Sequence, residues 1–314
     1  ISANAFERVK YQLQREWRNA PESSLTRQAQ RALGEALLTP QWSSRELLAA
    51  SQRLQIHHLE DFRQRFLEKL YVDAMAVGNL SEDQAEQQAG LIRGKLRPRL
   101  NRDAISELTP LQAKAGASVL RPDSTRDESL VLRYLQGNDT SLRHQAAVNV
   151  LAQWLETSFY QRLRTEEQLG YIVNAGYSPL LEAPGLAMIV QSPDTPSATI
   201  AERMDAFLQE ADERLEALDD EALAPYRQAV FERLTQRDTR LEALANRHWQ
   251  ATALKEVEFN RREQRAERAL DISAEELRKV WSTLRKRQLD IRFDPDDAKS
   301  DIRAFRETLT PFSR

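Results

Sequence analysis

The stretch from Leu163 to Val173 constrains the fold most, because it carries the chain from a long helix into a strand. Before it, apolar residues recur at three- and four-residue spacing, as on one buried helix face: Ala147, Val150, Leu151, Trp154 and Leu155. After it, the aromatic and β-branched run Tyr171–Val173 predicts a strand. Gly170 lies at the junction, where a residue able to adopt a positive φ is favoured. We therefore predict a helix from about Ser141 to Glu167 and a strand over Tyr171–Tyr177.

Two polar side chains flank this junction. Arg164 places a cation near the C-terminus of the predicted helix, and Tyr171 places a phenol at the start of the predicted strand. One interpretation is structural, with Arg164 offsetting the helix dipole and Tyr171 half-buried in packing. The other is that both side chains contact a ligand, and residue chemistry alone leaves the two interpretations open.

The first hundred residues are predicted to be mostly helical. The expected helices are Phe6–Trp17, Leu25–Leu38, Arg45–Leu54, His58–Leu70 and Glu82–Leu96, the last with a capping box of Ser81 and Gln84. The expected strand is Tyr71–Val77, before the turn pair Gly78-Asn79. A lone strand cannot satisfy its backbone donors and acceptors. Residues 1–100 are therefore predicted to be the second half of a domain whose opening strands lie upstream.

A linker is expected over residues 101–112, and a complete domain over 113–314. The strands predicted in that domain are Ala117–Leu120, Ser129–Leu135, Tyr171–Tyr177, Leu186–Gln191 and Leu289–Phe293. Helices are predicted between them, from Thr195 to about Ala217 and in three later segments that end with Ser273–Lys286, and a last helix over Asp296–Leu309. A helix–strand–helix order thus recurs at the end of both domains, which indicates a tandem repeat.

Composition excludes several classes of function. The net charge is −3, from 45 basic and 48 acidic residues, so no long-range field favours nucleic acid or an anionic membrane as a partner. The chain has no Cys, which excludes disulfides, thiol nucleophiles and thiolate metal sites. No apolar run reaches membrane-spanning length.

The candidate metal site is the run His57-His58-Leu59-Glu60-Asp61. An inverted zinc motif, H-x-x-E-H, needs two His on one helix face with a Glu between them. His57 and Glu60 fit this pattern, but Asp61 occupies the position of the second His. We expect a polar helix start here. Zinc held by His57, Glu60 and Asp61 is the alternative, and it would make the chain an enzyme by itself.

The run LRTEEQLGYIV, from Leu163 to Val173, resembles the C-terminal half of the pitrilysin/insulinase family of zinc endopeptidases. The similarity continues through Gly185–Ser192 and Arg203–Leu208, and more weakly at His248-Trp249 and Phe259–Arg261. The family has four homologous α/β domains in two halves that enclose a chamber, with the zinc motif in the first domain. The last domain supplies an Arg and a Tyr that contact substrate, and these correspond to Arg164 and Tyr171.

The resemblance implies an α/β (α+β) fold of two pitrilysin-like domains, each a mostly antiparallel sheet packed with helices. Residues 1–100 would be the truncated third domain of the family and 113–314 the fourth. The expected function is that of the non-catalytic half of a zinc endopeptidase, inactive alone, with zinc and catalysis supplied by the N-terminal half. Its partners would be that half and a peptide substrate, and bacterial relatives suggest the periplasm. The alternative is a non-enzymatic partner or scaffold without zinc in either half.

Overall fold

The computed structural model describes residues 1–254, 258–295 and 298–312, and the chain divides into two compact units. Unit 1 comprises Ile1–Asn19, Trp42–Leu108 and Arg237–Phe259, and unit 2 comprises Ala20–Gln41, Thr109–Gln236 and Asn260–Arg314. The predicted boundary near residue 100 therefore differs from this division, because two segments cross it. Residues 20–41 belong to unit 2, and residues 237–259 belong to unit 1. The assignment of family domains stays a prediction.

Unit 2 is built on a five-stranded sheet with the order β3-β7-β4-β6-β5. Its strands are β3 (Gly116–Leu120), β4 (Ser129–Gln136), β5 (Ile172–Tyr177), β6 (Gly185–Ser192) and β7 (Arg287–Phe293). β3 and β7 are parallel and the other pairs are antiparallel. Each of these strands was predicted from the sequence, to within two residues at each end. The mixed α/β class with antiparallel-rich sheets is confirmed.

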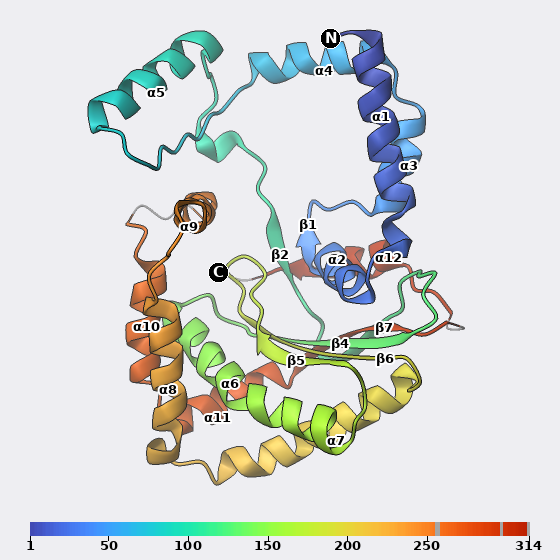
Figure 1. Ribbon diagram of the computed structural model, residues 1–314, viewed down its shortest axis with the longest axis vertical. Helices are drawn as coiled ribbons and strands as arrows, with labels where there is room; N and C mark the ends of the chain where they lie inside the picture. The colour runs from blue at the N-terminus through green and yellow to red at the C-terminus, as the bar shows by residue number, and fades with distance from the viewer. Residues whose placement is uncertain (255–257, 296–297, 313–314) are drawn as a thin grey trace. The chain divides into compact units, whose positions relative to one another are not determined.

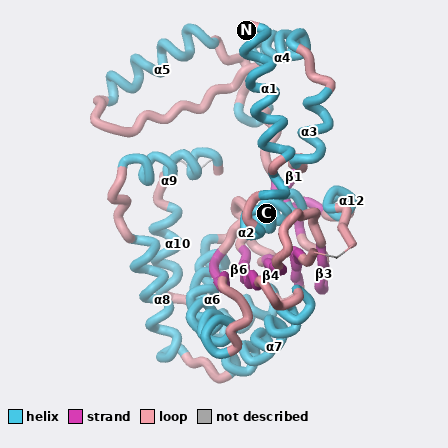
Figure 2. The backbone as a smooth tube through the Cα atoms, turned by 45° about the vertical axis from the view of Figure 1, so that its right-hand side comes forward, coloured by secondary structure: helices cyan, strands magenta, loops and turns pink. Residues whose placement is uncertain are grey.

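Helices cover both faces of this sheet (Figures 1 and 2). On one face α2 (Leu25–Leu37) packs its alanines and leucines against Leu130, Leu132 and Tyr134 of β4. On the other face, Val131 and Leu135 of β4 pack against a layer of five helices. These are α6 (Leu142–Tyr160), α7 (Ser197–Glu216), α8 (Asp220–Thr235), α10 (Arg261–Leu270) and α11 (Ala274–Leu284). The alternation along β4 thus separates two cores, as a strand period of two requires.

A small second sheet in unit 2 pairs three short strands in the order β1-β2-β8. These are β1 (Leu38–Thr39), β2 (Thr109–Gln112) and β8 (Thr310–Pro311), and β2 lies in the predicted linker. The helix predicted over Asp296–Leu309 is α12 (Ile302–Glu307). Residues 296 and 297, at its predicted start, lie outside the described residues.

Unit 1 is helical, with α1 (Ala3–Arg18), α3 (Ser44–Gln52), α4 (Ile56–Glu68), α5 (Glu82–Leu96) and α9 (Leu241–Ala253). The capping box of Ser81 and Gln84 is present at the start of α5. The prediction of a strand over Tyr71–Val77 is wrong, because this segment is extended but pairs with no strand of the described chain. Its backbone forms no hydrogen bond to another described residue, whereas Leu70 accepts two, from Arg99 and Leu100. A strand signal in the sequence needs a pairing partner to become a strand.

Candidate functional site

Arg164 lies in a widened helical segment. Helix α6 ends at Tyr160 and continues as a π-helical turn, Gln161–Glu166. There Glu167 N–H donates to the Arg162 carbonyl, five residues back, and Leu169 N–H donates to the Leu163 carbonyl. π-helical turns occur often at functional sites. From this turn the Arg164 guanidinium donates through Nη1 to the Gly170 carbonyl oxygen at 2.7 Å, which fixes it beside the first residues of the strand.

The turn itself differs from the prediction in one respect. The residue with a positive φ is Gln168, at 50°, and not Gly170. Gly170 is required for another reason, because a Cβ at this position would overlap the carbonyl oxygen of Gln191 in β6. That close approach lets the Tyr171 N–H donate to the same carbonyl at 3.0 Å. Gly170 therefore brings Tyr171 against the neighbouring strand.

Tyr171 belongs to a polar cluster at the end of the five-stranded sheet. Its ring is 48% exposed, and its hydroxyl donates to Glu128 Oε2 at 2.6 Å. Gln191 Nε2 donates to Glu128 Oε2 and to Tyr171 Oη, both at 2.6 Å. Thr26 at the start of α2 donates to Gln191 Oε1 at 3.3 Å. We call Tyr171, Glu128, Gln191 and Thr26 the sheet-end cluster.

The sheet-end cluster has a defined protonation state. The hydrogen bond from Tyr171, followed by that from Gln191, holds the pKa of Glu128 below its usual value. The hydrogen bond to Glu128 in turn raises the pKa of the Tyr171 hydroxyl. At neutral pH Glu128 is therefore a carboxylate, and Tyr171 is a neutral phenol whose proton is engaged.

Sequence reasoning did not find Glu128 and Gln191. They stand 43 and 20 residues from Tyr171, and only the pairing of strands brings them to it. Neither Arg164 nor Tyr171 leaves its polar group free in solvent. Arg164 is half-buried and bonded to Gly170, and the Tyr171 hydroxyl is bonded to Glu128.

One residue of the candidate metal site on α4, His58, has a structural role. His58 Nδ1 accepts a hydrogen bond from the Gln55 N–H at 3.0 Å, which closes a capping box at the start of α4. This confirms the polar helix start. In the part of the chain that the structure describes, no three His, Asp or Glu residues converge as metal ligands do.

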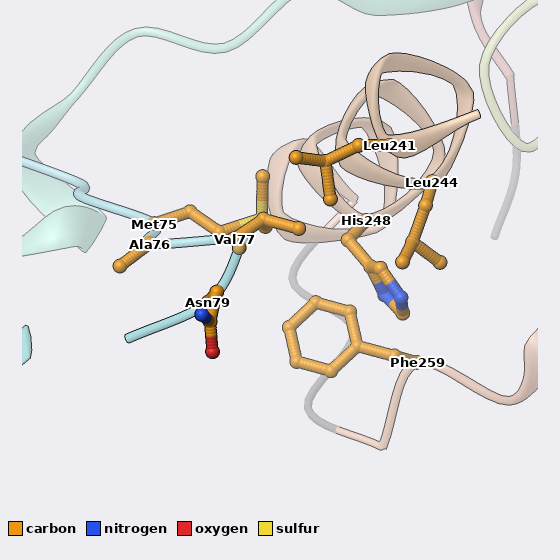
Figure 3. A pocket seen from close by; sticks show the side chains of 9 residues that line it. Met75, Ala76, Val77, Asn79, Leu241, Leu244, His248 and Phe259 are labelled. Carbon is orange, nitrogen blue, oxygen red and sulfur yellow. The ribbon is translucent and has the colours of Figure 1, made fainter. Parts of the chain in front are cut away.

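His248 lines a pocket within unit 1 of about 550 Å³ (Figure 3). The pocket is formed by residues 75–79 of the extended segment, by Leu241, Leu244 and His248 of α9, and by Phe259. The His248 ring meets the Phe259 ring edge-on at 5.1 Å between centroids. His248 therefore packs against Phe259 within unit 1.

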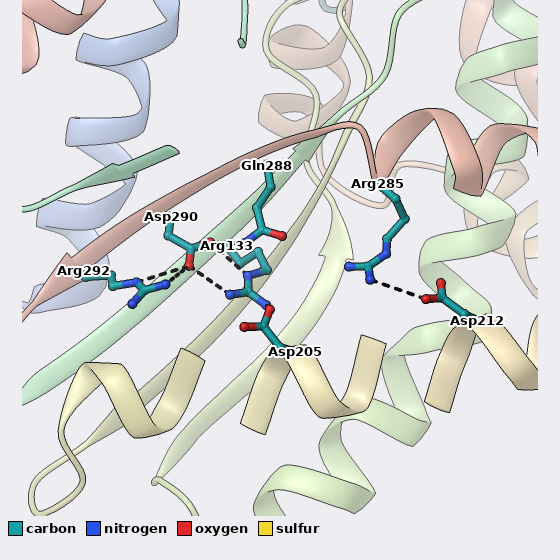
Figure 4. A network of polar contacts seen from close by, with 7 residues as sticks. All are labelled: Arg133, Asp205, Asp212, Arg285, Gln288, Asp290 and Arg292. Atoms are coloured by element: carbon teal, nitrogen blue, oxygen red, sulfur yellow. Dashed lines mark hydrogen bonds and ion pairs between the residues drawn. The ribbon is translucent and has the colours of Figure 1, made fainter. Parts of the chain in front are cut away.

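A buried charge network lies on the α7 face of the sheet in unit 2 (Figure 4). Arg133 of β4 donates to Asp290 of β7 through Nε and Nη2, each at 2.9 Å, and both side chains are fully buried. Arg133 Nη1 also contacts Asp205 of α7 at 2.5 Å, and Arg292 donates to Asp290 at 2.7 Å. This network connects β4 and β7 to α7, and no short sequence motif predicts it.

Comparisons with known proteins agree with this architecture. Residues 150–249 match the family described as PQQ synthase PqqF-like, C-terminal lobe domain 4. A nardilysin-like protein of Arabidopsis thaliana is 26% identical over 286 residues, 88% of this chain and 28% of its own length. The insulin-degrading enzyme of Drosophila melanogaster is 30% identical over 177 residues, 54% of this chain and 18% of its own length.

Solved structures share the fold. Pitrilysin superposes with a TM-score of 0.83 at 19% identity, over 100% of this chain and 35% of its own. A peptidase M16 inactive domain from Pseudomonas fluorescens gives 0.65 at 17% identity, over 95% of this chain and 72% of its own. The periplasmic protease PqqL of Escherichia coli gives 0.61 at 17% identity, over 98% of this chain and 36% of its own.

The fold is thus that of pitrilysin-like peptidase domains, a class that includes inactive domains. Together these comparisons support the pitrilysin/insulinase family for this chain, and within that family its C-terminal half. It spans less than a third of the length of these curated relatives.

Proposed function

We propose that this chain is the non-catalytic C-terminal half of a zinc-dependent endopeptidase, which closes the chamber and binds the peptide substrate. The observation that supports the proposal is the turn at Gly170, where the Arg164 guanidinium donates to the Gly170 carbonyl and the Tyr171 N–H donates to the Gln191 carbonyl at the end of the five-stranded sheet. Both side chains are fixed before any ligand arrives, and such preorganisation reduces the entropic cost of binding.

The two residues would bind different parts of a peptide. A guanidinium carries five N–H donors, and the bond to Gly170 uses one of them, so Arg164 could also donate to a peptide carbonyl. Tyr171 already donates to Glu128 and accepts from Gln191. Its contribution would come mainly from the exposed ring, and its hydroxyl could donate to a developing oxyanion only if the hydrogen bond to Glu128 broke.

The N-terminal half of the same protein would be the principal partner, and it would carry the zinc and the general base. Support comes from unit 1, where residues 71–77 are extended without pairing and two helices, α4 and α5, bury no residue. A sheet supplied by the upstream part would satisfy that backbone. The charge balance argues against nucleic acid and membranes as partners, and this stays a prediction.

The periplasm is the proposed compartment, with the likeness to the periplasmic protease PqqL as its support. No helix of the described chain combines the length and the apolar character that crossing a membrane requires.

The test uses the full-length protein with Arg164→Ala and Tyr171→Phe, assayed for peptide cleavage and melting temperature. Arg164→Ala should lower kcat/KM about a hundredfold, as loss of a charged transition-state donor does. Tyr171→Phe keeps the ring and removes only the hydroxyl, so it should lower kcat/KM by at most about tenfold, the scale of one hydrogen bond. Each variant should lose about 1 kcal/mol of stability, because each removes one hydrogen bond of the folded chain.

Two matched controls separate binding from folding. Arg162→Ala removes a guanidinium of the same π-helical turn, whose partners are the acids Glu166, Glu167 and Glu210. Tyr160→Phe removes the hydroxyl of a similarly exposed ring. Both controls should cleave normally. Cleavage unchanged in Arg164→Ala and Tyr171→Phe would remove the site and favour the scaffold alternative, as would an upstream half without H-x-x-E-H.

A further inference from the structure

At the sheet-end cluster the last residues of β6 lie between the first residues of β4 and those of β5. Leu130 of β4 pairs with Gln191 of β6, and Gln191 pairs with Ile172 of β5. Glu128 and Tyr171 stand just before the first residues of β4 and β5, so they flank Gln191 at the same end of the sheet. The register thus places one carboxylate, one amide and one phenol in a row.

The Glu128 side chain is negatively charged, and the groups that donate hydrogen bonds to it are neutral. Its two hydrogen-bond donors are the Tyr171 hydroxyl and the Gln191 amide. Within the described ranges, no Lys or Arg forms an ion pair with it. The nearby cation, Arg126, donates instead to the carbonyl oxygens of Glu22 and Ser23, at 2.6 and 3.4 Å. The half-buried Glu128 carboxylate thus forms no ion pair with a described residue, although the nearby charge of Arg126 contributes to lowering its pKa.

The hydrogen bonds of the cluster also limit what it can recognise. The Tyr171 hydroxyl donates to Glu128 and accepts from Gln191, so its proton is not offered outward. A carboxylate accepts hydrogen bonds only, and the face of a tyrosine ring attracts cations. The cluster therefore presents acceptors and a ring face, a combination complementary to an ammonium or a guanidinium.

We propose that Glu128 is a specificity-determining residue, which binds a cationic group of the peptide against the exposed ring of Tyr171. This inference rests on the proposed function, because it names the substrate chemistry of the same site. The cation is a Lys or Arg side chain or the N-terminal ammonium of the peptide. A purely structural Glu128 would only orient Tyr171.

Glu128→Gln separates these roles, since the glutamine keeps an oxygen that can accept the Tyr171 proton and loses only the charge. Asp127→Asn is the matched control, because it removes the neighbouring exposed carboxylate. Both variants should melt within about 1 °C of the parent, because Glu128→Gln keeps an acceptor for its two donors and Asp127 is exposed.

Binding is measured on the 314-residue chain by fluorescence anisotropy, with labelled nonapeptides of Ala, Ser and Gly. One probe is acetylated and has a central Lys, the second is acetylated with norleucine in that place, and the third has norleucine and a free amino terminus. The parent chain should bind the lysine peptide or the free-amine peptide at least fivefold more tightly than the acetylated norleucine peptide. Whichever probe gains identifies the source of the cation.

The variants decide the inference. Glu128→Gln should reduce the ratio of affinities between the cationic peptide and the acetylated norleucine peptide to about one. Asp127→Asn should leave this ratio unchanged. Equal affinities for all three probes in the parent, or a preference unchanged in Glu128→Gln, would overturn the role of Glu128. Such a result would leave the proposed function standing if Arg164→Ala still weakens binding of the norleucine peptide. A chain that binds no probe would overturn both.

Discussion

The two units of the chain treat their apolar side chains differently. Unit 2 buries the central strands and helices of both cores, and many of these side chains have no exposed surface. In unit 1, α4 and α5 bury no residue, and α1 buries Phe6 alone. Large exposed apolar side chains of the described residues concentrate there, including Trp42, Phe62, Phe66 and Leu91.

This difference indicates which unit can stand alone. In unit 2 each strand of the large sheet has a partner and each face has a helix layer, so burial offsets the entropy of ordering the chain. In unit 1 the capping and helix signals of the sequence are strong, but little apolar surface is removed from water. Exposed apolar patches of this kind mark interaction surfaces. Unit 1 is the part that we expect to depend on the proposed N-terminal half.

Hydrogen exchange should show the largest contrast. Amides of β4, in the centre of the sheet, should open only with the global free energy of unit 2, which for domains is about 5–15 kcal/mol. Amides of residues 71–77 have no backbone partner in the described chain and should exchange with an opening free energy near zero. Mass spectrometry of the isolated chain measures both. Comparable protection in the two segments would remove the contrast.

Breaking the buried network should cost unit 2 about 3–5 kcal/mol. Asp290→Ala removes the buried partner of the Arg133 guanidinium. Arg133 then keeps only its contact with the more exposed Asp205. The midpoint of urea unfolding reports the loss. The double variant Arg133→Met with Asp290→Leu should recover most of it, because it removes both charges. A single variant as stable as the parent would show that the buried pair of Arg133 and Asp290 does not stabilise unit 2.

The same substitution in each unit sharpens the comparison. Leu155→Ala, at a fully buried position of α6, should destabilise unit 2 by about 2–5 kcal/mol. Leu91→Ala in α5, where the side chain is 61% exposed, should change stability by less than about 0.5 kcal/mol. In the full-length protein we expect Leu91→Ala to become costly. Equal effects of the two substitutions in the isolated chain would contradict the account.

The sequence predicts the features of the fold and of the site that depend on residues close together in the chain. The apolar stripe Ala147–Leu155 and the run Tyr171–Val173 correctly indicate α6 and β5, because periodicity is a local signal. The reason for Gly170 is non-local: it lies against Gln191, and so the predicted positive φ falls on Gln168 instead. Glu128 and Gln191 reach Tyr171 only through strand register. Residues 71–77 carry a strand pattern, and pattern alone could not say whether a partner strand is present.

The smallest expected effect is the response of the sheet-end cluster to acid. The pKa of Glu128 lies below its usual value of 4.5, so its folded carboxylate binds a proton less readily than the unfolded one. The stabilisation from the Tyr171 bond is therefore present above pH 4.5 and lost as the pH falls through the lowered value. In ring-labelled NMR spectra the Tyr171 signal should shift in that range, and Glu128→Gln should abolish the shift. A Tyr171 signal that moves identically in Glu128→Gln would assign the titration to another group.

Photocrosslinking tests most directly whether peptide binds at the end of the sheet. Tyr171 is replaced by p-benzoylphenylalanine in the full-length protein, and Tyr160, similarly exposed, receives the same replacement as the control. After irradiation with a biotinylated peptide that the protein cleaves, we expect labelling from position 171 and little from position 160. Equal labelling from both positions, or none from position 171, would contradict it.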